Sequence, residues 1–142
     1  MVNTGEVLGD ICRMNIKNQK DSISQKLKNI ADKRGTLFPL IQTEFLIERL
    51  LARIVSDQGL SDSLIFKGGY VALRIYNSPR YTIDLDALLA KAGLRETLDR
   101  IKEVSSKDIG DCAWFAFEEE IDLKTQNDGG VGRNIRKILL SF

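Results

Sequence analysis

Two aspartates separated by a single leucine, Asp84 and Asp86, are the residues of this chain best suited to metal-dependent chemistry. If residues 83–89 form a β-strand, alternate side chains share a face, so the two carboxylates point the same way. A hard dication such as Mg²⁺ is commonly held by one or two carboxylates, with water and substrate phosphates as its other ligands. The spacing predicts a site for Mg²⁺ or Mn²⁺. The alternative is a pair of exposed acids on an edge strand.

A pair of glycines, Gly68 and Gly69, follows a short apolar segment upstream of the two acids. Residues without Cβ allow a phosphate to approach the backbone, and the N–H groups that open a helix favour an anion. We therefore expect the triphosphate of a nucleoside triphosphate at this turn. The alternative is a tight turn between a strand and a helix.

Five further side chains are candidates for the same site. Lys67 and Arg80 are expected to neutralise phosphate charge, although Lys67 also suits a surface position and Arg80 also suits an ion pair with an aspartate. Tyr70 suits stacking on a base or packing in the core. Ser78 suits a turn as well as nucleotide contact. Arg133 is expected to contact the nucleotide or the sheet.

Composition narrows the chemistry further. The chain has 142 residues, no histidine and a net charge of +1, with 43% apolar residues. Without imidazole, Ser-His-Asp and Cys-His nucleophile pairs and His-ligated zinc are excluded, whereas phosphoryl or nucleotidyl transfer needs oxygen ligands and positive charge. No apolar run approaches the roughly 20 residues that span a bilayer, so we expect a cytoplasmic protein.

Patterning predicts an α/β (α+β) fold with a small mixed twisted sheet flanked by helices. Residues 1–20 are expected to be an irregular lead-in and residues 21–142 a single core. Helices are expected from Ser22 to Gly35, from Pro39 to Gly59, and over residues 70–76 and 94–104. Strands are expected over residues 64–66, 83–89, 114–117 and 131–142, with a turn at residues 128–130.

The order of an apolar strand, Lys-Gly-Gly, a short helix, Ser-Pro-Arg and Asp-x-Asp resembles the AbiEii-type nucleotidyltransferases, toxins of type IV toxin–antitoxin and abortive-infection systems. The likeness extends over about residues 20–142. It implies a nucleotidyltransferase-like core that uses an NTP and Mg²⁺ or Mn²⁺. The acceptor implied is RNA, such as a tRNA end, or a protein, and the partner implied is a cognate antitoxin.

The chain also departs from that family's pattern. Relatives carry a third carboxylate on a later strand and continue into a helical C-terminal region, whereas this sequence stops at Phe142, and Asp122 is the nearest substitute for the third acid. An alternative hypothesis is therefore a truncated, non-catalytic remnant that binds nucleotide or a partner. Such a remnant would form a homodimer to cover the apolar surface left open. A third, weaker interpretation takes Asp-Leu-Asp as the nucleotide-sugar motif of a glycosyltransferase.

Overall fold

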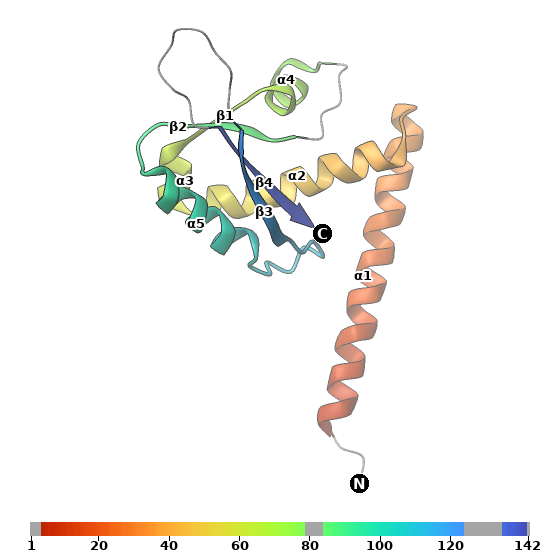
Figure 1. Cartoon of the computed structure of the whole chain (residues 1–142). Coiled ribbons are helices and arrows are strands. Elements are labelled where there is room, and N and C mark those ends of the chain that lie inside the picture. The colour runs from red at the N-terminus through yellow and green to blue at the C-terminus, as the bar shows by residue number, and fades with distance from the viewer. Residues whose placement is uncertain (1–3, 79–83, 124–134, 142) are drawn as a thin grey trace, which may run out of the picture.

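The computed structural model describes the backbone of residues 4–78, 84–123 and 135–141, and the side chains of residues 17–78 and 84–121. The described elements are helices and short antiparallel ladders, which confirms the α+β class (Figure 1). In chain order they are α1 (Thr4–Arg34), α2 (Phe38–Ser56), α3 (Gln58–Ser63), β1 (Leu64–Lys67), α4 (Gly69–Tyr76), β2 (Asp86–Leu89), α5 (Leu94–Ser105), β3 (Ala116–Leu123) and β4 (Ile135–Ser141).

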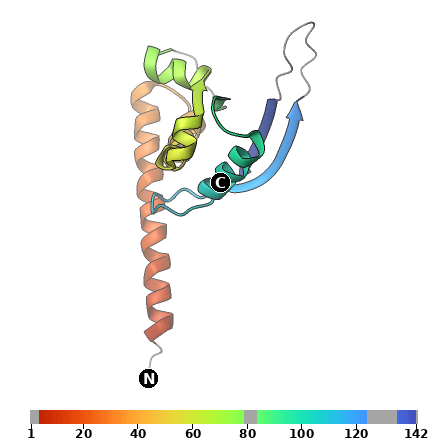
Figure 2. The same ribbon diagram turned by 90° about the vertical axis from the view of Figure 1, so that its left-hand side faces the viewer.

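The longest element, α1, contradicts the expected lead-in. Residues 1–20 were expected to be irregular, but the helix begins at Thr4 and continues to Arg34. The segment contains no proline, the residue that disfavours a helix interior most strongly. Gly35 ends it as expected, with a positive φ of 61° that favours glycine. Figures 1 and 2 show the N-terminal half of α1 extending away from the other helices.

One expected helix is two helices in the structure. Pro39 lies in the first turn of α2, as the sequence indicated, but α2 ends at Ser56 instead of Gly59. The Asp57 carboxylate then accepts a hydrogen bond from the Leu60 N–H at 3.0 Å and caps α3. A side chain that satisfies a free helical N–H favours a new helix start at this point. The hydrophobic core lies where α2, α3, α5 and β1 meet, and consists of Ile54, Leu60 and Val104 with Leu50, Leu64, Phe66 and Ile101 against them.

Strands β1 and β2 form a short antiparallel ladder beside this core. Phe66 packs against the core, whereas Ile65 and Lys67 are exposed on the other face. Strand β2 begins at Asp86, so the expected strand over residues 83–89 is shorter than predicted at its start. Within the described part of the chain, residues 84 and 85 precede the ladder, and residue 83 lies outside the description.

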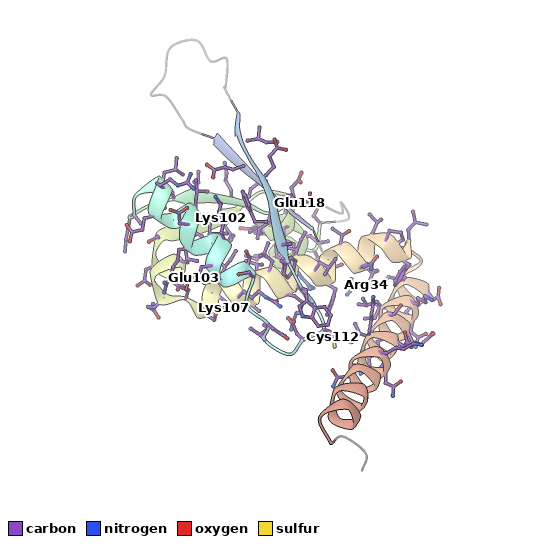
Figure 3. The ribbon with its side chains drawn as sticks, turned by 60° about the horizontal axis from the view of Figure 1, so that its bottom comes forward. Arg34, Lys102, Glu103, Lys107, Cys112 and Glu118 are labelled. Atoms are coloured by element: carbon purple, nitrogen blue, oxygen red, sulfur yellow. The ribbon has the colours of Figure 1, made fainter. Side chains whose placement is uncertain are left out.

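Strands β3 and β4 form a second antiparallel ladder, which curves away from the helices in Figure 2. β3 starts and ends later than the expected strand over residues 114–117, and β4 lies inside the expected strand over residues 131–142. The turn expected at residues 128–130 lies outside the described residues. Lys102 of α5 connects this ladder to the core, because its Nζ lies 3.1 Å from Glu120 Oε2 and 4.2 Å from the Phe117 ring centre (Figure 3).

Candidate functional site

The turn between β1 and α4 places a bend of the backbone directly beside a carboxylate. Gly68 has φ 84° and ψ −158°, a conformation that residues with side chains rarely adopt. A Cβ built on Gly68 would overlap the Asp86 carboxylate and lie 3.2 Å from its Cγ. Two separate constraints, backbone conformation and space, therefore require glycine here. The motif glycine that we singled out from the sequence lies against one of the two motif acids.

Lys67 and Asp86 lie directly opposite each other in the β1–β2 ladder. Paired residues of an antiparallel ladder project to the same face, so the ammonium and the carboxylate share one side of the sheet. Both side chains are exposed. Among the residues that the structure describes, neither side chain has a hydrogen-bond or ion-pair partner. A cation and an acid, both open to solvent, thus flank the Gly68 turn.

Asp84 is exposed and lies two residues before Asp86. The regular alternation of side chains that would place both carboxylates on one face applies inside a strand. Because β2 begins at Asp86, that argument does not reach Asp84. A shared face for the two acids therefore stays a prediction.

Tyr70, the second residue of α4, is buried with 6% of its surface exposed. Arg74 Nε donates a hydrogen bond to its hydroxyl at 3.4 Å. Burial raises the pKa of the Tyr70 hydroxyl, and the negative charge of Glu44 raises it further. These contacts favour the packing interpretation of Tyr70 over stacking on a base.

The remaining predicted residues fall into two groups. Gly69 is the first residue of α4, where its position suits the expected turn. Ser78 follows the end of α4, and its backbone N–H donates to the Ala72 carbonyl at 3.3 Å, so it takes part in ending the helix. Arg80 and Arg133 lie outside the described residues.

A buried carboxylate on α2 holds α4 in place, and sequence reasoning missed it. Glu44 is 6% exposed, and its two oxygens lie 3.2 Å from Arg34 Nη1 and 3.2 Å from Arg74 Nη1. Arg74 also forms an ion pair with Glu48. One carboxylate therefore connects α1, α2 and α4, close to the junction of α1 and α2 where Figure 3 shows Arg34. The sequence did contain a signal for its burial, because Glu44 lies three residues after the buried Ile41 and therefore on the apolar face of α2.

Two other carboxylates, those of Asp57 and Glu120, differ from Asp86 because each has a cationic or N–H partner. The hydrogen bond from the Leu60 N–H lowers the pKa of Asp57, and the hydrogen bond from Lys102 lowers the pKa of Glu120. Asp86 has no comparable side-chain partner among the described residues. A carboxylate that is neither paired nor buried, beside a backbone turn that excludes Cβ, remains available for an external cation.

The donor set suits a hard divalent ion. Mg²⁺ needs few protein carboxylates because water and substrate phosphates complete its shell. No group of three or more Asp, Glu, Cys or His side chains gathers among the described residues. Asp122, the substitute considered for a third acid, lies on β3, whose ladder partner is β4, and not on the β1–β2 ladder. The structure places one carboxylate, that of Asp86, at the Gly68 turn, which is compatible with the one or two protein carboxylates that Mg²⁺ commonly takes.

A protein-family model described as "Nucleotidyl transferase AbiEii toxin, Type IV TA system" matches residues 49–141, which is more than half of the chain. The chain belongs to the AbiEii family. The match begins within α2 and ends within β4, so it contains the Gly68 turn and both motif aspartates. Comparisons with curated proteins and with solved structures give no match.

Membership in the AbiEii family confirms the resemblance seen in the Lys-Gly-Gly to Asp-x-Asp segment. It supports a nucleotidyltransferase-type toxin, and a type IV toxin–antitoxin family suggests an antitoxin as partner. Among the described helices, none combines the length and the apolar character needed to cross a membrane.

Proposed function

We propose that this AbiEii protein is a metal-dependent nucleotidyltransferase that transfers a nucleotide from an NTP to a hydroxyl of an RNA or protein acceptor. The observation that carries the proposal is the unpaired Asp86 carboxylate, which lies against the Gly68 turn with Lys67 opposite. Family membership supports the reaction class. The cytoplasm, where NTPs are abundant, is the proposed location.

Each residue of the turn has a role in this proposal. Gly68 and Gly69 let the triphosphate approach the N–H groups at the start of α4, where the helix dipole favours negative charge. Lys67 and Arg80 neutralise charge on the phosphates as pyrophosphate leaves. Asp84 and Asp86 hold Mg²⁺ or Mn²⁺, which when bound would neutralise and orient the triphosphate.

The transfer exchanges one bond at the α-phosphorus for another. The acceptor oxygen forms a bond to the α-phosphorus while the bond from that phosphorus to the bridging oxygen breaks. Pyrophosphate leaves with the electron pair of the broken bond, and the proton of the acceptor hydroxyl passes to water. The chain has no histidine, so any general base that it supplies is a carboxylate or a lysine, while the turn contributes positioning and charge compensation.

Nucleotide binding by aspartate variants tests the metal site. We expect isothermal titration of GTP, CTP, ATP and UTP with Mg²⁺ to detect binding to the wild type, weakened at least about tenfold in Asp86→Asn and in Asp84→Asn. Asparagine keeps the shape but removes the charge. Glu103→Gln is the matched control, because it neutralises an exposed acid on α5, on another element (Figure 3). Equal binding by Asp86→Asn and wild type would refute the proposed metal site.

A second candidate function is nucleotide binding without transfer. It is favoured by the finding that no third acid gathers with Asp84 and Asp86 among the described residues. Incubation with α-³²P-labelled NTPs and total RNA or protein separates the two candidates. Label in the acceptor supports the transferase, whereas nucleotide binding without labelled acceptor supports the second candidate.

A further inference from the structure

Two large apolar side chains lie open to solvent on the face of the ladder that carries Lys67 and Asp86. Ile65 is 56% exposed and Leu88 is 46% exposed. They are direct partners in the ladder, one same-face step from the Lys67 and Asp86 pair. We call Ile65 and Leu88 the apolar step.

The apolar step does not serve the hydrophobic core. Leu64 and Phe66, which alternate with Ile65 along β1, turn to the opposite face and pack against the core. Exposed apolar residues scattered singly are ordinary on protein surfaces. Ile65 and Leu88 instead adjoin each other and the Lys67 and Asp86 pair. In ligand sites, apolar side chains supply contact area and a few polar groups fix orientation.

We propose that the apolar step contacts the ribose and base of the NTP whose triphosphate lies at the Gly68 turn. The inference rests on the proposed function and adds the residues that bind the non-phosphate part of the substrate. Successive same-face positions on a strand are roughly 7 Å apart. Because the ribose separates the phosphates of a nucleotide from its base, a nucleotide lying along the ladder covers Ile65 and Leu88.

The chemistry of this contact determines what it contributes. Bases have flat faces that pack against apolar and aromatic side chains, whereas base identity is read by hydrogen bonds at the edges. Ile65 and Leu88 have no hydrogen-bonding groups in their side chains. The apolar step therefore adds affinity for nucleosides in general and does not distinguish one base from another.

Binding of nucleotides and of inorganic triphosphate, each with Mg²⁺, separates the apolar step from the phosphate site. We expect Ile65→Thr and Leu88→Thr each to lower the affinity for the NTP that the wild type binds by about three- to tenfold, because apolar contact with the nucleotide is lost. Inorganic triphosphate should bind the variants and the wild type equally. Threonine favours strands, so the ladder is retained. Val55→Thr is the matched control, since Val55 is 51% exposed on α2 and lies outside the ladder.

The outcomes are distinct. If the NTP binds both variants as tightly as it binds the wild type, the role of the apolar step is wrong. The same holds if the affinities for the NTP and for inorganic triphosphate fall equally. Both results leave the proposed function in place. A wild type that binds neither NTP nor inorganic triphosphate would overturn both. If sedimentation shows a wild-type dimer that Ile65→Thr/Leu88→Thr dissociates, the surface is an interface between two copies, and the proposal is wrong.

Discussion

The Gly68 turn and the surroundings of Arg53 use the same kinds of charged group in opposite ways. At the turn, Lys67 and Asp86 are exposed and their side chains have no partner among the described residues. Arg53, by contrast, is 1% exposed and its guanidinium is fully hydrogen-bonded. The difference separates charges that hold the fold from charges that remain available to a ligand.

Arg53 ties α2 to the loop before β3. Its Nη1 and Nη2 donate to the two Asp111 oxygens, each at 2.9 Å, in a bidentate pair. The guanidinium also lies 5.0 Å from the Phe115 ring centre. It donates further hydrogen bonds to three backbone carbonyls, those of Arg49, Lys107 and Ala113, at distances of 2.8, 3.0 and 2.6 Å. A buried cation with every donor satisfied cannot be replaced without leaving polar groups unpaired.

The charged side chains at the Gly68 turn have no such set of hydrogen bonds, so they contribute little to stability. Exposed charges are solvated by water, and their removal changes the free energy of unfolding by small amounts. The same openness lets a cation or a phosphate bind without first displacing a protein partner. We therefore expect substitutions near Arg53 to affect folding, and substitutions of the exposed charges at the turn to affect ligand binding.

The largest effect is expected for Arg53→Met. The substitution leaves the Asp111 carboxylate and three carbonyls without their donor, so the free energy of unfolding should fall by about 3–5 kcal/mol. Urea unfolding followed by circular dichroism measures this. Arg53→Met/Asp111→Leu should regain about 0.5–3 kcal/mol, because the unpaired charge is also removed. If the free energy of unfolding of Arg53→Met fell by less than about 1 kcal/mol, Arg53 would not stabilise the fold more than the exposed charges at the turn do.

A smaller loss of stability, with a large loss of binding, is expected for Gly68→Ala. Alanine at φ 84° and ψ −158° is strained by roughly 1–3 kcal/mol, and its Cβ displaces the Asp86 carboxylate. Gly35→Ala is the matched control, since φ is 61° there but nothing lies within 4 Å of the added Cβ. Thermal unfolding should show a loss for both variants, and the larger loss for Gly68→Ala, because only there does the added Cβ overlap a side chain. Titration with Mg²⁺ and NTP should show weaker binding in Gly68→Ala alone, and equal binding in both would contradict the role of the turn.

The smallest effect is a difference in acid sensitivity at Asp111. Burial raises the pKa of Asp111, but hydrogen bonds from Arg53 and the Ala113 N–H outweigh it and hold the pKa below 3.8. A lowered folded-state pKa stabilises the protein above pH 3.8, and this stability is lost as pH falls through the folded-state pKa. Between pH 6 and pH 3, wild type should therefore lose more unfolding free energy than Asp111→Asn. Asp57, Asp99 and Glu120 are the same in both proteins, so their contributions to the pH dependence cancel. Urea unfolding of both proteins at each pH measures the free energy of unfolding, and an equal pH dependence in the two would contradict this prediction.

Local sequence predicted the elements around the site well. The apolar strand, the glycine turn and the short helix after it are β1, Gly68 and α4, because each depends on neighbouring residues. The end of α1 at Gly35 and the helix over residues 94–104 were predicted for the same reason. The predicted start of α1 was wrong because residues 1–20 show no firm apolar period. The prediction of one helix in place of α2 and α3 was wrong because the capping role of Asp57 was not recognised.

The sequence by itself determined the family motif and the candidate acids, and its lack of histidine excluded chemistry that needs an imidazole. Tertiary structure alone decided that Lys67 faces Asp86, that Asp86 lies against Gly68, and that Tyr70 packs inside. It also decided that Arg53 meets Asp111, 58 residues away. The physical reason is that these contacts join segments distant in sequence, so their partners depend on how the helices and the ladder pack, and no local period or propensity specifies them.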